Sequence, residues 1–377
     1  MGDDHDQLRV ECDPVPVSLA SVTADFEALQ PASECPYLTL RWLQSWAAAY
    51  EPRRLLAIRV LDTAERVVAV AVLEELRWGR LRFAGAPVTP VRGLLCAPGR
   101  DVAAWSALTS WFAGQRRSRW LEASGLDASV ATGRSVVVVP LSWLSMQLPG
   151  NFDAFLAARP PRIRSNLRRR LRIAEREGLE AHPAHAGARA AAIDAFVRLH
   201  RERARAKREA HPNIDWRLAE LLVRLGEHQT PRLSVMTLQR DGDAIAVGLA
   251  MEQGTADWFY NFGFDPSVAK LSPGVVLGLA SIRAAIARGA TRCDFGPGDA
   301  RYKRDLGGEP VPRIRLEATS ASLSGQVHRA GAVVRRQMRD VSVVREAREK
   351  GLRVTAPSRT ARDGMLTPSW RSHRHPG

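Results

Sequence analysis

Ten residues in the second half of the chain have the sequence Asp294-Phe295-Gly296-Pro297-Gly298-Asp299-Ala300-Arg301-Tyr302-Lys303. The apolar residues before Asp294 predict a strand that ends there, and the Gly-Pro-Gly triplet predicts a turn out of the sheet. Asp299 is then expected to cap a helix that carries Tyr302 and Lys303. Open α/β sheets bind ligands where strands end beside helix N-termini, so this stretch predicts a functional site.

The composition is that of a globular protein. With 377 residues, of which 45% are hydrophobic, the chain can form two domains and a tail. It has no run of 18 apolar residues, and its N-terminus is acidic, so we expect neither a transmembrane segment nor a secretory signal, and a cytoplasmic location. The four cysteines lie far apart without a CxxC pair and no HExxH occurs, so no metal site is predicted.

The formal net charge of +15 is concentrated in two segments. Residues 159–176 hold eight Arg and one acid, and residues 329–377 hold twelve Arg and Lys and four acids. The rest of the chain is neutral overall. The charge therefore indicates one basic helix and a basic tail rather than a basic fold.

The first half, residues 1–150, has the pattern of a mixed α/β domain. Trp and Leu at helical spacing predict a helix over 37–50, and β-branched runs predict strands over 55–60 and 67–76. Shorter strands are expected near 81–84, 93–96, 120–123 and 135–140, with a helix over 105–112.

The second half, residues 151–323, is predicted to begin with helices over 152–178, 190–208 and 216–225. Three alternating runs joined by Asp241-Gly242 and Gln253-Gly254 then predict an antiparallel meander over 233–264. Ser272 as N-cap, Pro273 at the first helical position and Gly289 after the end predict a helix between them. The strand into Asp294, the short helix with Tyr302 and a last strand near 311–317 complete the half. Residues 324–377 are expected to be a partly disordered basic tail, with one helix over 333–348.

This order of elements resembles the second half of GNAT-fold acyltransferases. The segments Tyr260-Asn261-Phe262-Gly263-Phe264-Asp265-Pro266, Leu271-Ser272-Pro273-Gly274-Val275-Val276-Leu277 and Cys293 to Lys303 resemble the GNAT branch named for the cellulose-biosynthesis protein CelD. The similar content of the two halves further resembles the tandem GNAT-like halves of Fem-type peptidyltransferases. The expected fold is thus a mixed-sheet α/β fold with tandem GNAT-like (acyl-CoA N-acyltransferase) domains, the second being the better match.

The resemblance implies a site for acyl-CoA, with acetyl-CoA as the expected co-substrate and no metal. It places cofactor contacts at Phe262, on a strand that offers amides to the thioester, and at Ser272, Pro273, Gly274 and Val275, where a helix N-terminus suits a pyrophosphate. Tyr302 lies where these enzymes commonly carry the phenol that protonates the departing sulfur. Asp294 and Asp299 are alternatives for the base that takes the amine proton or for positioning the amine. Lys303 is expected to bind an anion or pair with an acid. Lys270 to Val276 contains a single glycine, fewer than the usual GNAT pyrophosphate loop.

The basic segment predicts an amphipathic helix with Ile163, Leu167, Leu171 and Ala174 on its apolar stripe. Its arginines are either a solvated face or a surface for an anionic partner. By resemblance to the branch, Arg164, Asn166 and Arg168, together with Tyr260, are candidate contacts for substrate or phosphate. No aromatic residues alternate with these arginines, so sequence-specific nucleic-acid binding is not predicted.

Three functions remain open from the sequence. The first is acyl transfer, most simply N-acetyl transfer, from acyl-CoA to an amine or hydroxyl of a saccharide or cell-envelope precursor; the saccharide comes only from the family resemblance. The second is a Fem-like transferase that uses aminoacyl-tRNA. The third is a catalytically silent GNAT-fold module that binds an anionic polymer. The sequence does not determine the oligomeric state.

Overall fold

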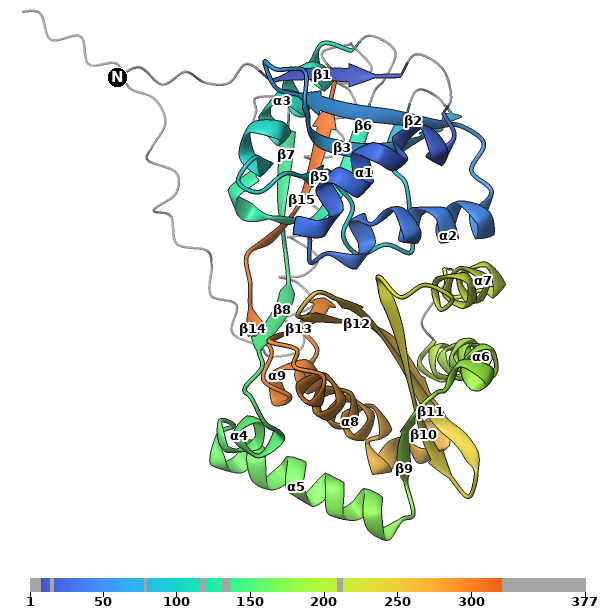
Figure 1. Cartoon of the computed structure of the whole chain (residues 1–377). Coiled ribbons are helices and arrows are strands. Elements are labelled where there is room, and N and C mark those ends of the chain that lie inside the picture. The colour runs from blue at the N-terminus through green and yellow to red at the C-terminus, as the bar shows by residue number, and fades with distance from the viewer. Residues whose placement is uncertain are drawn as a thin grey trace, which may run out of the picture. The chain divides into compact units, whose positions relative to one another are not determined.

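The structure is a computed structural model that describes residues 8–13, 17–77, 80–115, 120–130, 136–208 and 213–320. These residues belong to one compact unit, which spans residues 1–328. They form two mixed β-sheets with flanking helices, in agreement with the mixed α/β expectation (Figure 1). The predicted tail, including its helix over 333–348, lies outside the described residues.

The first sheet is built mainly by the N-terminal half. Its strands lie in the order β1 (Arg9–Cys12), β2 (Leu55–Leu61), β3 (Val67–Leu76), β4 (Arg80–Phe83), β6 (Trp120–Asp127), β15 (Arg313–Thr319) and β7 (Val136–Leu141), and β5 (Leu95–Cys96) pairs with β3. The helices of this half are α1 (Thr23–Leu29), α2 (Leu40–Tyr50) and α3 (Asp101–Ala113). Each predicted strand and helix of this half is present within a few residues of its expected bounds.

The second sheet contains the predicted meander. Its strands lie in the order β14 (Glu309–Pro310), β8 (Trp143–Gln147), β13 (Arg292–Pro297), β12 (Ala256–Phe264), β11 (Asp243–Gln253), β10 (Arg232–Arg240) and β9 (Glu180–Pro183). Asp241 and Gly242 both have positive φ, of 53° and 86°, as a tight hairpin turn requires. The antiparallel meander over β10, β11 and β12 is therefore confirmed, while β13 adds to it in parallel.

Helices cover both faces of the meander. Successive residues of β10 point to opposite faces of the sheet. Val235 packs in one core cluster with α6 (Arg189–Lys207) and α7 (Trp216–Leu225). Met236 packs in another cluster with α8 (Pro273–Ala287). Figure 1 shows α6 and α7 on one side of the sheet and α8 on the other. The remaining helices are α4 (Phe152–Ala157), α5 (Pro161–Arg176) and α9 (Arg301–Asp305).

The two halves exchange strands. β15, the expected last strand, lies between β6 and β7 in the first sheet, where Leu316 faces Ala123 across the ladder. In return β8, from before residue 150, pairs with β13 of the second sheet. The cause is apolar matching, because Ile314, Leu316 and Ala318 are buried in the core of the first sheet. Each sheet thus contains one strand from the other half of the sequence. The domain boundary at residue 150 stays a prediction.

Candidate functional site

The parallel strands β12 and β13 pair over only three residues and then separate. The ladder runs from Ala256 opposite Arg292 to Trp258 opposite Asp294, although β12 continues to Phe264. A register shift opposite Leu249 and Ala250 leaves Tyr260 as the extra residue of a bulge in β12. Beyond it the Phe262 amide donates to the side-chain oxygen of Asn261 at 2.8 Å. In this opening the backbone of β12 no longer pairs with β13.

The ring of Phe262 brings two of the predicted residues together. Tyr302, on α9, packs edge-on against it, with ring centroids 5.2 Å apart and planes at 88°. Gly274, in the first turn of α8, lies so close that a Cβ there would be 2.8 Å from Phe262 Cε2. The turn from β13 into α9 depends on Gly296 and Gly298, whose φ values are 67° and 91°. Segments 28 residues apart in sequence therefore meet on one aromatic ring.

Tyr302 is a neutral phenol in this environment. Burial raises its pKa to about 12, although the positive charge of Arg203 acts in the opposite direction. Such a group keeps its proton through the physiological range, so its hydroxyl is present as a donor. The predicted role of Tyr302 as general acid is chemically consistent with this state.

α8 begins where the sequence predicted, but the side chain of its N-cap residue makes no hydrogen bond to the helix. Ser272 is the N-cap and Pro273 is the first helical residue, yet the Ser272 hydroxyl makes no capping bond. The amides of Val275 and Val276 donate to the Ser272 carbonyl, and Pro273 has no N–H, so Gly274 holds the remaining amide of this turn. A side chain at position 274 would also force the Phe262 ring to move.

Asp294 is almost completely buried, with 1% of its surface exposed. Its Oδ1 accepts from Trp143 Nε1 at 2.7 Å and from the Gly296 amide at 2.8 Å, and its Oδ2 has no hydrogen-bond partner among the described residues. Burial raises the pKa of this carboxyl, while the bonds from Gly296 and Trp143 act against the rise. The strand continues past Asp294 to Pro297, so Asp294 lies within the end of β13 rather than after it.

The prediction that Asp299 caps the following helix is wrong. The N-cap of α9 is Ala300, and the Asp299 carboxylate instead pairs with the guanidinium of Arg304, including a bond of 2.6 Å from Nη2. A two-point contact with a guanidinium is stronger than a capping bond, which explains the difference. This pairing with Arg304 lowers the pKa of Asp299.

Lys303 makes a structural contact that the sequence did not indicate. Only 8% exposed, it donates from Nζ to the carbonyl oxygen of Pro297 at 2.6 Å and, more weakly, to that of Gly298 at 3.4 Å. Burial lowers the pKa of its ammonium to about 8, against the opposing effect of the carboxylates of Asp294 and Asp299. Lys303 therefore holds the turn that leads from β13 to α9.

The lowered pKa of Lys303 predicts a pH dependence of stability. An unfolded Lys titrates near 10.4, so between about pH 8 and 10 the unfolded chain binds more protons than the folded one, and this residue's contribution to stability rises with pH. Relative to Lys303→Met, the wild-type protein should gain about 1 to 2 kcal/mol between pH 7.5 and 10 in urea unfolding. Lys270→Met, at an exposed position, is the control. A constant difference between wild type and Lys303→Met would contradict the assignment.

Tyr260 connects β12 to the first half of the chain. Its hydroxyl donates to the Val88 carbonyl at 2.9 Å, its ring packs edge-on against Trp42, and burial raises its pKa. Tyr260 and Asn261, with Trp143 and Pro297, also line a hollow of about 400 Å³ whose other wall includes Val88 and Thr89. This hollow lies where β12 and β13 separate.

The basic helix is confirmed, and its predicted anion residues have their contacts on and next to the helix itself. In α5, Ile163, Leu167 and Leu171 pack in the core. Arg164 donates to the Ala157 carbonyl, Asn166 accepts from Arg169, and Arg164 and Arg168 line a hollow of about 640 Å³ on the helix surface. No contact of Arg164, Asn166 or Arg168 with Phe262 or Tyr302 is found in the described part of the chain.

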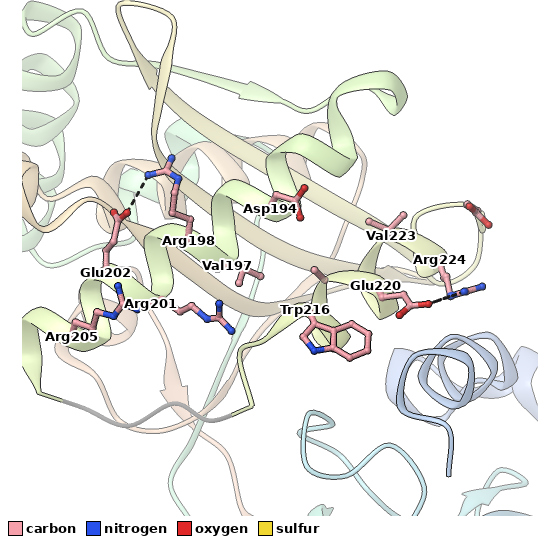
Figure 2. Close-up of a pocket in the computed structure, with 12 residues that line it drawn as sticks. Asp194, Val197, Arg198, Arg201, Glu202, Arg205, Trp216, Glu220, Val223 and Arg224 are labelled. Carbon is pink, nitrogen blue, oxygen red and sulfur yellow. Dashed lines mark hydrogen bonds and ion pairs between the residues drawn. The ribbon is translucent and has the colours of Figure 1, made fainter. Parts of the chain in front are cut away.

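Arg203, which the sequence analysis did not select, does lie at Phe262. Its guanidinium is 5.5 Å from the centroid of the Phe262 ring and 5.6 Å from that of Phe264. In sequence it is one of several basic residues near the end of α6, and only its spacing from Phe196 and His200, seven and three residues earlier, marks it as inward-facing. Figure 2 shows other arginines of α6, among them Arg198 and Arg201, in the outer groove of about 790 Å³ between α6 and α7.

The residues around Phe262 lie in a segment of the chain that matches a known protein family. Residues 161–304 match the family model for the acetyltransferase (GNAT) domain, a range that includes Arg203, Phe262, Gly274 and Tyr302. This segment is thus similar to the GNAT domain, in a chain with two mixed sheets.

Solved structures agree with this fold at low identity. FemX is similar with a TM-score of 0.57 and 11% identity, over 85% of this chain and 99% of that one. The C-terminal domain of a protein described as a lysylphosphatidylglycerol synthetase from Agrobacterium fabrum has a TM-score of 0.52 and 10% identity, over 84% and 98% of the two chains. L-PGS from Bacillus licheniformis has a TM-score of 0.51 and 11% identity, over 79% and 92%. A search of the curated proteins gives no match.

In the described residues, no helix has the length and apolar character needed to cross a membrane.

Proposed function

We propose that this protein is an acyltransferase that moves an acyl group, most simply acetyl, from acyl-CoA to an amine or hydroxyl. The observation that carries the proposal is the meeting of Gly274 and Tyr302 on the Phe262 ring, next to the point where β12 and β13 separate. The match of residues 161–304 to the GNAT domain supports it.

The residues present fit acyl-CoA as a co-substrate. Beyond Trp258, β12 no longer pairs with β13, and no hydrogen bond of the Gly274 amide is found among the described residues. The free edge of β12 and the start of α8 are thus where an acyl carrier with a pyrophosphate would bind. Acyl-CoA would supply the acyl group as a thioester. Tyr302 holds a proton on its hydroxyl that can pass to the departing sulfur.

The acceptor is assigned to the hollow of about 400 Å³ beside Tyr260 and Asn261. Among the described residues of its wall, the one ionised side chain is Arg92, which pairs with Glu122 at 2.5 Å, so the hollow favours an uncharged acceptor group. A saccharide or cell-envelope precursor, and the CelD-type branch, follow only from the sequence resemblance. Asp294 and Asp299 are both bonded to other groups, so neither is assigned as the base.

A Fem-like use of aminoacyl-tRNA is the second candidate. It is favoured by the similarity to FemX over 85% of this chain and 99% of that one, and by the exposed arginines of α5. Such arginines would bind phosphates of any sequence.

Thermal unfolding with ligands separates these functions. Acetyl-CoA or CoA at about 100 times the dissociation constant should stabilise the protein by about 2.7 kcal/mol, with a matching rise in melting temperature. A bulk tRNA preparation should have no effect at moderate salt. Stabilisation by tRNA alone, lost as salt increases, would instead support the Fem-like candidate, and no response to either ligand would support a silent module.

A further inference from the structure

Arg203 is a charged residue on the inward face of its helix. α6 packs so closely on β12 that a Cβ at Gly263 would be 2.7 Å from the His200 amide and 2.8 Å from the Phe196 carbonyl. Arg203 is one turn further along this same face. The arginines at 198, 201 and 205 belong to the opposite face, which lines the outer groove (Figure 2). An inward-facing charge on an amphipathic helix costs desolvation and needs a compensating partner.

In the part of the chain that the structure describes, the partner found for Arg203 is aromatic. The rings of Phe262 and Phe264 stack with centroids 6.2 Å apart and planes at 19°, and the guanidinium lies over both. Its Nε is buried without a hydrogen-bond partner, and no ion pair of Arg203 with an acid is found within the described residues. A guanidinium on an aromatic surface is held in one orientation, and its unused donors suit the two-point binding of an oxyanion.

The residues near Arg203 indicate which oxyanion it would bind. Phe262 contacts both Arg203 and Gly274, and α6 contacts the turn Pro266–Leu271 that leads into α8. Among the described residues, the one amide of this helix start for which no hydrogen bond is found is that of Gly274, where a glycine-rich loop would present several. The exposed Lys270 in the same turn adds a second positive charge.

We propose that Arg203 binds the diphosphate of the acyl-CoA donor at the start of α8, where it replaces donors that the short loop lacks. This role rests on the proposed function and specifies which residue holds the donor. It assigns to α6 a part of the donor site, in addition to its role in packing against β12.

Calorimetric titration of the full chain with CoA and with pantetheine, which lacks the diphosphate, tests the role. Arg203→Leu should weaken CoA binding by about ten- to a hundredfold, the scale of a lost hydrogen-bonded charge contact, and leave pantetheine binding unchanged. Arg203→Lys should recover part of the CoA affinity, because it keeps the charge but not the planar fork. Arg205→Leu, on the exposed face of the same helix, should bind CoA as the wild type does.

Two results would overturn the role of Arg203 and leave acyl transfer standing: unchanged CoA affinity in Arg203→Leu, or an equal loss for CoA and pantetheine, which would indicate disturbed packing of Phe262. The melting temperature of each variant without ligand shows whether its fold is intact. A wild-type protein that binds neither CoA nor acetyl-CoA would refute the proposed function, and this inference with it.

Discussion

Replacing Tyr302 with Phe is expected to lower turnover with acetyl-CoA by about 100- to 1,000-fold, the scale of a lost general acid. CoA affinity and melting temperature should change little, because the ring that packs on Phe262 is retained and only the hydroxyl is removed. Steady-state kinetics and calorimetric titration with CoA measure the two effects separately. A loss confined to turnover is the mark of a group that acts in the transition state.

The pH profile provides an independent check on Tyr302. Because burial raises its pKa to about 12, the phenol stays protonated between pH 6 and 9, and Tyr302 should contribute no descending limb in that range. Tyr50→Phe is the matched control, since Tyr50 is also a partly buried phenol whose pKa burial raises to about 12. Unchanged turnover in Tyr302→Phe, or an equal loss in Tyr50→Phe, would remove Tyr302 from the role.

Replacing Asp294 with Ala is expected to destabilise the protein by about 2 to 5 kcal/mol. The change leaves two buried donors, Trp143 Nε1 and the Gly296 amide, without the oxygen that accepts from both. It therefore weakens the contact between β8 and the turn that leads to Tyr302. Urea unfolding measures the loss.

Asp294→Asn separates structure from catalysis at this position. The amide oxygen can still accept both bonds, so the cost should be about 1 kcal/mol, and turnover should remain within a few-fold of the wild type. A large fall in turnover with an intact fold would instead identify Asp294 as the base, one of the two roles that the sequence left open.

Local elements were predictable because their signals lie close together in the chain. Pro273 after Ser272 indicated where α8 begins, and the Asp241-Gly242 and Gln253-Gly254 turns indicated the meander. The stripe from Ile163 to Ala174 indicated α5 and its buried side. Each depends on residues a few positions apart, whose spacing directly reflects helical or strand periodicity.

The partners of individual side chains were not predictable in this way. Asp299 was expected to cap α9 and instead pairs with Arg304, because two groups near a helix start compete for one carboxylate. Asp294 is bonded to Trp143, 151 residues earlier, and no local pattern relates the two. Arg203 was missed because nothing in the sequence around it shows which aromatic rings it will cover.

The sequence by itself determined the identity and order of most helices and strands, and the residues Phe262, Gly274 and Tyr302 as candidates. Only the tertiary structure decided that β15 and β8 exchange sheets, that Phe262 is the ring on which Gly274 and Tyr302 meet, and that Arg203 joins them. The physical reason is distance along the chain. Periodicity and turn residues act over a few positions, whereas sheet pairing, burial and charge compensation join residues that only the folded core brings into contact.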